Sequence, residues 1–302
     1  MVAIIKTEKL TKSYGPHRGI VDVDLEVQQG EVFGFLGPNG AGKTTTIRVL
    51  LDLIRPTSGK AFVFGIESTA DPVAIHRRIG YLPGEFTLYD KLTGGDTLEY
   101  FGNLRGGVDR EYQASLIERF DLDPSRKFKE YSKGNKQKVG LVAALQHKPE
   151  LLVLDEPTSG LDPLVQQTFF AVVREAVADG RSVFLSSHVL SEAEKACDRV
   201  AIIRDGRIVM VDRVDALRDL AAHQVELSFT GPVPAAEFEK IPGVTGVVAE
   251  DHVLRMHVTG PIAPVVKAAA NYELADFVSR EPSLEETFLA QYSQPASEVG
   301  RS

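Results

Sequence analysis

The chain has 302 residues, 43% of them hydrophobic and 25% charged, which is an ordinary globular composition with room for about two domains of roughly 150 residues. A net charge of −8 argues against a nucleic-acid-binding surface, and a single cysteine, Cys197, excludes an intrachain disulfide and a multi-cysteine metal site. The N-terminus has no apolar core of a signal peptide, and no apolar run reaches the length of a membrane span. We therefore expect a cytosolic chain, with any membrane spans supplied by other subunits, and a buried, structural Cys197.

Short strands are expected over residues 3–64. The segment from Val21 to Val27 alternates apolar and polar residues, which is typical of a half-buried strand. Ala61–Phe64 is predicted to be a further strand, after a turn at residues 56–59. Tyr14 falls in an expected loop before the second strand, where an exposed aromatic ring can pack on protein or stack on a base, and the sequence leaves both open.

The segment from Gly37 to Thr44 fits the phosphate-binding pattern G-x-x-x-x-G-K-[ST]. It lies between an apolar segment, Val32–Leu36, that predicts a buried strand and a segment, Thr44–Leu53, with helical spacing. Backbone N–H groups and the helix N-terminus attract phosphate, the lysine reaches its terminal groups, and the threonine hydroxyl binds Mg²⁺. A glycine-rich turn with an exposed lysine is the alternative, but it leaves the flanking strand and helix unexplained. The candidate nucleotide contacts are Gly37, Asn39, Gly40, Gly42, Lys43, Thr44 and Thr45.

A helical insert is predicted between strands of the core, at about residues 96–147. A strand at Ile79–Leu82 ends before Pro83, and helical spacing of apolar residues follows. The last helix of the insert is expected to begin after Ser132, whose hydroxyl suits an N-cap.

Two further apolar strands end in polar side chains. Leu151–Leu154 leads into Asp155 and Glu156, and Val183–Ser187 leads into His188. Ligand groups of α/β folds lie at the carboxyl ends of strands. We predict that Asp155 holds Mg²⁺ through water, that Glu156 deprotonates an attacking water, and that His188 contacts the γ-phosphate. Two carboxylates capping a following helix are the alternative, which the upstream phosphate loop disfavours.

The pattern restarts at about Val225, after a hairpin predicted at Asp205-Gly206. The order strand, helix, two strands, helix, strand is the split βαβ motif, and a final helix is expected at Ser283–Tyr292. We predict a nucleotide-binding domain over residues 1–220 and an accessory α+β domain over residues 221–302, in which we identify no chemical site.

Together these motifs resemble the ATP-binding subunit of ATP-binding cassette (ABC) transporters, over roughly residues 3–218. Ser132-Lys133-Gly134-Asn135-Lys136-Gln137 is similar to the family signature, normally Ser-Gly-Gly-Gln, and Ser159–Asp162 resembles the loop that crosses the dimer interface. His188 matches the switch histidine, and Tyr14 matches the aromatic residue that stacks on adenine. The segment Glu281–Glu286 resembles the tail of ATPases that energise ABC-2-type exporters of drugs, antibiotics or envelope polymers.

The resemblance implies an α/β fold: a P-loop NTPase ABC ATPase core with an antiparallel β subdomain and a helical subdomain, plus a small C-terminal α+β (ferredoxin-like) domain. It implies that two subunits, identical or similar, close head-to-tail on ATP and Mg²⁺, and that hydrolysis drives an integral-membrane permease subunit at the cytoplasmic face of the cell membrane. The implied catalytic residues are Glu156, His188 and Lys43, with Ser132, Gly134 and Asp162 as nucleotide contacts and Thr44 and Asp155 as metal ligands.

Two departures from the family pattern affect the site. Lys133 stands where glycine is usual and Asn135 where glutamine is usual. A cation at the start of a helix opposes the helix dipole, so we expect the ATP of the second subunit to face Lys133. Gly84-Glu85 stands where a glutamine normally senses Mg²⁺ and the membrane partner. We treat Glu85 as a candidate Mg²⁺ ligand, with an exposed loop carboxylate as the alternative.

Two rival functions are a soluble cassette ATPase of DNA repair or translation and a regulatory nucleotide-binding module without turnover. Chains of the first class carry long coiled coils, zinc-binding cysteines or two cassettes. This chain has one cysteine, one phosphate loop and no long heptad pattern. Glu156 and His188 argue against a module without turnover.

Overall fold

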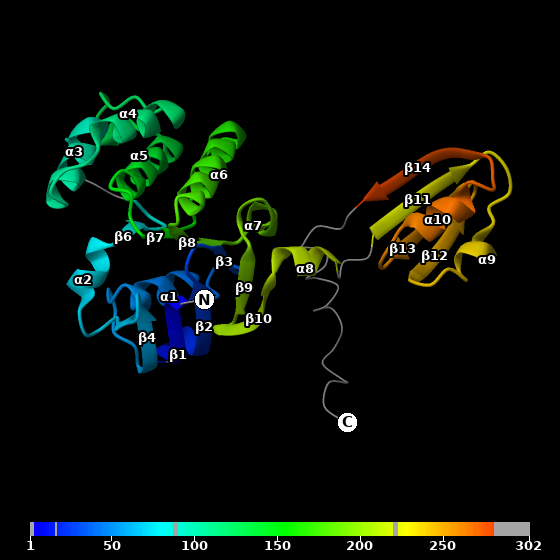
Figure 1. Cartoon of the computed structure of the whole chain (residues 1–302), viewed down its shortest axis with the longest axis horizontal. Coiled ribbons are helices and arrows are strands. Elements are labelled where there is room, and N and C mark those ends of the chain that lie inside the picture. Colours follow the sequence, from blue (N-terminus) through cyan, green and yellow to red (C-terminus); the bar gives the residue numbers. More distant parts are fainter. Residues whose placement is uncertain (1–2, 16, 87–89, 220–222, 281–302) are drawn as a thin grey trace. The chain divides into compact units, whose positions relative to one another are not determined.

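The computed structural model describes residues 3–15, 17–86, 90–219 and 223–280 (Figure 1). The chain divides into two compact units, Met1–Asp212 and Arg213–Ser302. The domain boundary that we placed after residue 220 stays a prediction.

A six-stranded sheet forms the centre of the first unit, in the order β10-β9-β3-β8-β7-β6. Strand β3 pairs in parallel with β8 and β9, and β7 pairs in parallel with β6 and β8. Strands β3, β7 and β8 are completely buried, which explains their continuous apolar runs. The bounds are β3 Val32–Leu36, β6 Ile79–Leu82, β7 Leu151–Asp155, β8 Ser182–Ser187, β9 Arg199–Arg204 and β10 Arg207–Arg213.

The turn between β9 and β10 is the predicted Asp-Gly hairpin. Asp205 and Gly206 have φ angles of 51° and 78°. Positive φ at both central residues is what a type I′ turn requires, and it matches the twist of the strands that it joins.

A second, antiparallel sheet of the first unit has the order β2-β1-β4-β5. Its strands are β1 Ala3–Tyr14, β2 His17–Gln28, β4 Ser58–Val63 and β5 Ile66–Glu67. Tyr14 is therefore the last residue of β1, and our placement of it in a loop was wrong, because β1 pairs with β2 as far as that residue. Strand β4 begins earlier than predicted, since pairing of Ser58 with Thr11 extends it into the expected turn.

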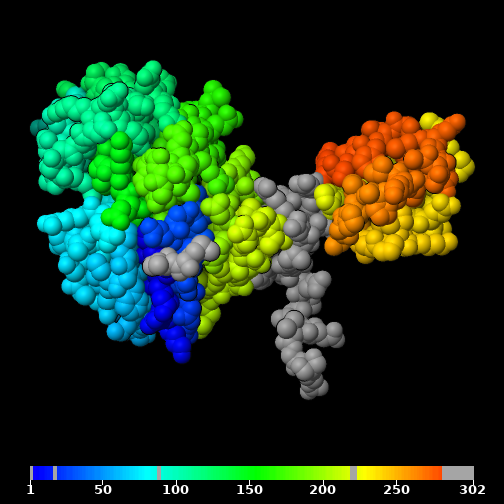
Figure 2. All heavy atoms as spheres, viewed as in Figure 1, coloured from blue at the N-terminus to red at the C-terminus, as the bar shows by residue number. Residues whose placement is uncertain are grey.

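Helices pack against the sheets of the first unit and also form the predicted insert. The bounds are α1 Lys43–Leu50, α2 Pro72–Arg77, α3 Gly94–Leu104, α4 Arg110–Arg119, α5 Lys133–Leu145, α6 Pro163–Ala178 and α7 Leu190–Ala196, with a 3₁₀ turn, η1, at Phe128–Glu130. The expected helical subdomain is present: α3, α4 and α5 gather in one lobe, drawn in teal and green at the top of the first unit (Figure 2). Helices α2, α6 and α7 were not predicted from the sequence, although Asp162 before Pro163 is a recognisable start signal for α6.

Cys197 is buried, as expected, and packs against a strand of the central sheet. A Cβ atom at Gly34 of β3 would lie 2.8 Å from the Cys197 Sγ. The bare glycine backbone therefore makes room for the sulfur. Burial raises the pKa of the Cys197 thiol, so the side chain behaves as a small apolar group.

The second unit contains α8 Val214–Asp219 and a four-stranded sheet backed by two short helices. The strands are β11 His223–Phe229, β12 Val244–Glu250, β13 Val253–Val258 and β14 Leu274–Arg280, and the helices are α9 Ala235–Phe238 and α10 Ala263–Ala269. The order β12-β13-β11-β14, with every pair antiparallel, is that of the split βαβ motif. The helix predicted at residues 283–292 lies outside the described residues.

Within the described ranges, no helix combines the length and the apolar character needed to cross a membrane.

Candidate active site

The phosphate-loop segment connects the buried strand β3 to α1, as its pattern predicts. Gly40 and Gly42 have φ angles of 81° and 113°, which residues with a Cβ rarely adopt. Gly42 is the cap residue of α1, and no side chain accepts a hydrogen bond from the N–H groups of the first turn. This helix start therefore presents donors and a partial positive charge to an anion.

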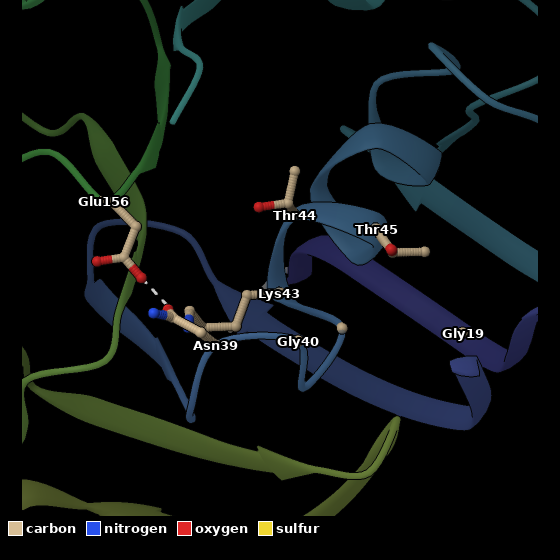
Figure 3. Close-up of a pocket in the computed structure, with 8 residues that line it drawn as sticks. Gly19, Asn39, Gly40, Lys43, Thr44, Thr45 and Glu156 are labelled. Atoms are coloured by element: carbon tan, nitrogen blue, oxygen red, sulfur yellow. Dashed lines mark ion pairs between the residues drawn. The ribbon is translucent and has the colours of Figure 1, made fainter. Parts of the chain in front are cut away.

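Lys43 is buried at the centre of this loop. Its Nζ donates hydrogen bonds to the carbonyl oxygens of Gly37 at 2.6 Å and Pro38 at 3.3 Å, and it lies 3.2 Å from Oε1 of Glu156 (Figure 3). Only 6% of the side chain is exposed. A buried ammonium group needs such partners. They hold this one beside the start of α1, where a bound phosphate would contact it.

Asp155 and Thr44, the two residues expected to hold Mg²⁺, are in direct contact. The Thr44 hydroxyl donates to Oδ2 of Asp155 at 2.7 Å, and the Ser186 hydroxyl donates to Oδ1. The carboxylate is fully buried at the end of β7. A Cβ at Gly84 would lie 3.2 Å from Oδ2, so the glycine leaves the space beside this oxygen open.

Glu156 follows β7 in a left-handed conformation, with φ of 51°. Its backbone N–H donates to Ser186 of the neighbouring strand, and its Oε2 is hydrogen-bonded to Nδ1 of His188 at 2.7 Å. The other oxygen, Oε1, is buried, and among the described residues it has no hydrogen-bond partner, only the ion pair with Lys43. Because α6 begins at Pro163, the reading of the two carboxylates as helix caps is wrong.

A pocket of about 290 Å³ opens onto these groups (Figure 3). It is lined by Gly19, Asn39, Gly40, Gly42, Lys43, Thr44, Thr45 and Glu156. All of these except Gly19 were predicted from the sequence as site residues. Gly19 lies in β2, and a glycine within a strand often marks a close approach of another backbone. Here a Cβ would lie 1.7 Å from the carbonyl oxygen of Lys12.

Eight predicted site residues are not among those that line the pocket. Three of them, Gly37, Asp155 and His188, are hydrogen-bonded to residues that do line it, and five are not. Tyr14 is 43% exposed at the end of β1, and Glu85 is exposed. Ser132 is the N-cap of α5, and its hydroxyl accepts from the Asn135 N–H. The other two are Gly134 in the first turn of α5 and Asp162, the cap of α6.

Lys133 has a partner in its own chain. Its Nζ donates to the Ser159 hydroxyl at 2.9 Å, and a Cβ at Gly160 would lie 3.3 Å from its Cγ. The cation is thus bound to the loop before α6.

Comparisons with known proteins place this geometry in a family. The family model described as "ABC transporter" matches residues 20–159. The daunorubicin/doxorubicin resistance ATP-binding protein of Streptomyces peucetius is 35% identical over 310 residues, covering 97% of this chain and 94% of that protein. This chain belongs to the ATP-binding proteins of ABC transporters. The bacitracin transport ATP-binding protein of Enterococcus faecalis is 33% identical, covering 85% of each chain.

Solved structures of ABC proteins have the same fold. An ATP-binding subunit of an ABC transporter is 32% identical, with a TM-score of 0.66, and covers 71% of this chain and 92% of that chain. A dimeric bacterial ABC transporter cassette matches with a TM-score of 0.64 at 23% identity, over 70% of this chain and 98% of that chain. As an ABC transporter ATPase, the chain binds ATP, and its relatives do not favour a repair or translation ATPase.

The site fits an ATP molecule that brings Mg²⁺ with it. The uncapped start of α1 and Lys43 supply positive charge, and the buried Oε1 of Glu156 supplies an acceptor whose one partner among the described residues is the ion pair with Lys43. In the part of the chain that the structure describes, no cluster of three or more His, Cys, Asp or Glu residues could hold a metal. Nucleotide-bound Mg²⁺ needs only one or two protein ligands, since phosphates and water complete its shell, and Thr44 with Asp155 meets that need.

Proposed function

We propose that this chain hydrolyses Mg²⁺–ATP and that hydrolysis powers a separate integral-membrane permease subunit that exports a drug or antibiotic. The observation that carries the ATPase is the placement of Glu156 between Lys43 and His188 at the mouth of the phosphate loop. The names of the relatives, which concern resistance to daunorubicin and transport of bacitracin, support the class of cargo.

The roles of the residues follow from their contacts. Lys43 and the start of α1 bind the terminal phosphates and stabilise charge on the transferring group. Thr44 and Asp155 hold Mg²⁺, which neutralises phosphate charge and orients the group when it is bound. Glu156 accepts the proton of the attacking water, and its hydrogen bond with His188 fixes the direction of the carboxylate.

The residues outside the pocket fit a site that two subunits share. Ser132, Gly134 and Asp162 lie near the start of α5 and α6, at positions that resemble the signature and the crossing loop of the family. We infer that they contact the ATP of a second copy or of a similar subunit, and that Tyr14 stacks on adenine. This assembly works at the cytoplasmic face of the membrane, where its permease partner lies.

Two measurements test the proposal. Purified protein should release phosphate from ATP in the presence of Mg²⁺, and phosphate release should stop when EDTA removes the metal. A tagged chain should co-purify an integral-membrane protein from detergent extract. A pure, folded protein without Mg²⁺-dependent phosphate release would overturn the ATPase assignment.

We expect Glu85→Gln to change the Mg²⁺ dependence of hydrolysis. Glu85 is exposed, and the adjacent Gly84 leaves open space beside Asp155, so this loop lies next to the expected metal. A charged oxygen binds a hard cation more strongly than a neutral one, so the glutamine variant should need more Mg²⁺ for half-maximal rate. Mg²⁺ titrations of both proteins, alone and with the membrane partner, make the comparison. Superimposable curves in both settings would assign Glu85 to the surface.

A chain that ends after residue 220 should still bind ATP. The pocket residues all belong to the first compact unit, and that unit includes both sheets of the core. Titration with a fluorescent ATP analogue should therefore give a dissociation constant within about threefold of the full chain's, a difference of well under 1.4 kcal/mol. Loss of affinity by a truncated chain with an unchanged circular dichroism spectrum would show that the C-terminal unit contributes to the site.

A further inference from the structure

The start of α5 touches the segment that carries Glu156. The residues from Glu156 to Asp162 connect β7 to α6, and we call them the connecting segment. Gln137, on the second turn of α5, is 4% exposed, and its Nε2 donates to the carbonyl oxygens of Glu156 at 3.1 Å and Pro157 at 3.0 Å. One amide group thus binds the backbone of the proposed base and of the next residue.

Two further contacts join the same elements nearer the start of α5. Lys133 donates to the Ser159 hydroxyl at 2.9 Å. Gly134 lies so close that a Cβ there would be 2.4 Å from the carbonyl oxygen of Gly160. The connecting segment is therefore bound to α5 at its beginning and at its middle.

These contacts matter because Glu156 is held in an unusual backbone conformation. Its φ of 51° is costly for a residue with a side chain, and such conformations persist only where surrounding contacts fix them. On one side the backbone N–H donates to Ser186 of β8. On the other side the carbonyl accepts from Gln137, so strand β8 and helix α5 hold opposite ends of the same residue.

We propose that Gln137 is the positioning residue for the Glu156 carboxylate, with Lys133 as a second anchor, so that α5 sets the place of its own chain's catalytic base. The inference rests on the proposed function, in which Glu156 is that base. The helix that carries these anchors also begins with Ser132 and Gly134, which we assign to the ATP of the second subunit. Contact with that ATP is thereby transmitted through α5 to the hydrolysis site of the same chain.

The test compares Gln137→Met with Gln146→Met. Methionine keeps the length of the side chain and removes the amide donor. Gln146, the C-cap residue of the same helix, is a matched control: it is 1% exposed, its Nε2 donates to the Leu98 carbonyl at 3.1 Å, and its Oε1 accepts from Gln113, away from Glu156. We expect Gln137→Met to lower kcat about 10- to 100-fold with KM unchanged, because small displacements of a reacting group cost that much. Gln146→Met should leave kcat within about twofold.

A double-mutant cycle separates positioning from general damage. In the Glu156→Gln background the base is already lost, so adding Gln137→Met should change the residual rate by less than about twofold. A further 10-fold loss there would overturn the assignment. Hydrogen exchange of a peptide covering residues 156–162, measured without nucleotide, should be faster in Gln137→Met and unchanged in Gln146→Met. Equal exchange in all proteins would also overturn it.

Lys133, the second anchor, gives a further test: it is exposed, so replacing it should not unfold the protein. Lys133→Met and Ser159→Ala each remove the same hydrogen bond, so both should lower kcat, and the double variant should be no worse than either single one. The control is Lys136→Met, which removes another lysine of α5, one whose Nζ lies over the Phe128 ring of η1. Additive losses in the double variant would contradict the anchor. If the wild type hydrolyses ATP and Gln137→Met has the same kcat and KM, only this inference is rejected. If the wild type itself is inactive, the proposed function is rejected.

Discussion

Glu156→Gln should slow ATP hydrolysis by about 10²–10⁴-fold, the usual worth of a general base. The amide keeps the shape of the side chain and its hydrogen bond with His188, but it cannot accept a proton from water. ATP affinity should be retained or increased, because Oε1 of Glu156 no longer pairs with the Nζ of Lys43 at 3.2 Å. The measurement is phosphate release under saturating ATP, together with calorimetric ATP binding.

The control for that variant is Glu192→Gln. Glu192 also lies after a strand of the central sheet, but it accepts a hydrogen bond from the Ser187 hydroxyl and has no ion pair with Lys43. Its rate should stay within about twofold of the wild type, as is usual for substitutions outside the reacting groups. A Glu156→Gln protein that hydrolyses ATP at a near-normal rate would remove Glu156 from the catalytic role and leave His188 or water as the base.

Lys43→Ala should weaken ATP binding by about 10- to 150-fold, since a hydrogen bond to a charged group is worth about 1.5–3 kcal/mol. The variant removes the cation at the centre of the phosphate loop and leaves the buried Oε1 of Glu156 without its ion-pair partner. Two anionic groups, the phosphate and the carboxylate, would then share one side of the pocket. Equilibrium titration with a fluorescent ATP analogue measures the loss.

A second buried lysine provides the comparison. Lys138 is 7% exposed and donates to the carbonyl oxygen of Asp121 at 3.1 Å, in the helical subdomain. Lys138→Ala should lower the melting temperature and keep the ATP affinity. An equal loss of affinity in both variants would show that any buried lysine matters through stability, and that Lys43 has no special role toward phosphate.

Much of the core could be predicted because each element carries its own local signal. The continuous apolar runs of β3, β7 and β8 indicate strands buried on both faces, and the phosphate loop has a fixed spacing. The carboxyl ends of these parallel strands meet at one edge of the sheet, so the sequence alone predicts Asp155 and Glu156 beside the loop. Their contacts with Thr44, Lys43 and His188 agree with that prediction.

Other features could not be read from local patterns because distant contacts determine them. Tyr14 belongs to β1 only because β2 pairs with it. The partner of Lys133 is Ser159, 26 residues further along the chain, and no spacing rule connects the two. The left-handed backbone of Glu156 could not be predicted either, because that conformation is expected at glycine and this residue is a glutamate. Contacts with the elements on either side impose it.

The carboxylate of Asp162 already accepts hydrogen bonds within its own chain. Its Oδ1 accepts hydrogen bonds from the N–H groups of Leu164 at 3.1 Å and Val165 at 3.0 Å, and so it closes the first turn of α6. Turning this side chain toward a second subunit means surrendering that cap, at a cost of about 1 kcal/mol per chain. Association would then break one helix cap in each subunit. Because both caps form again when the subunits separate, their hydrogen bonds would favour separation once the nucleotide no longer holds the subunits together.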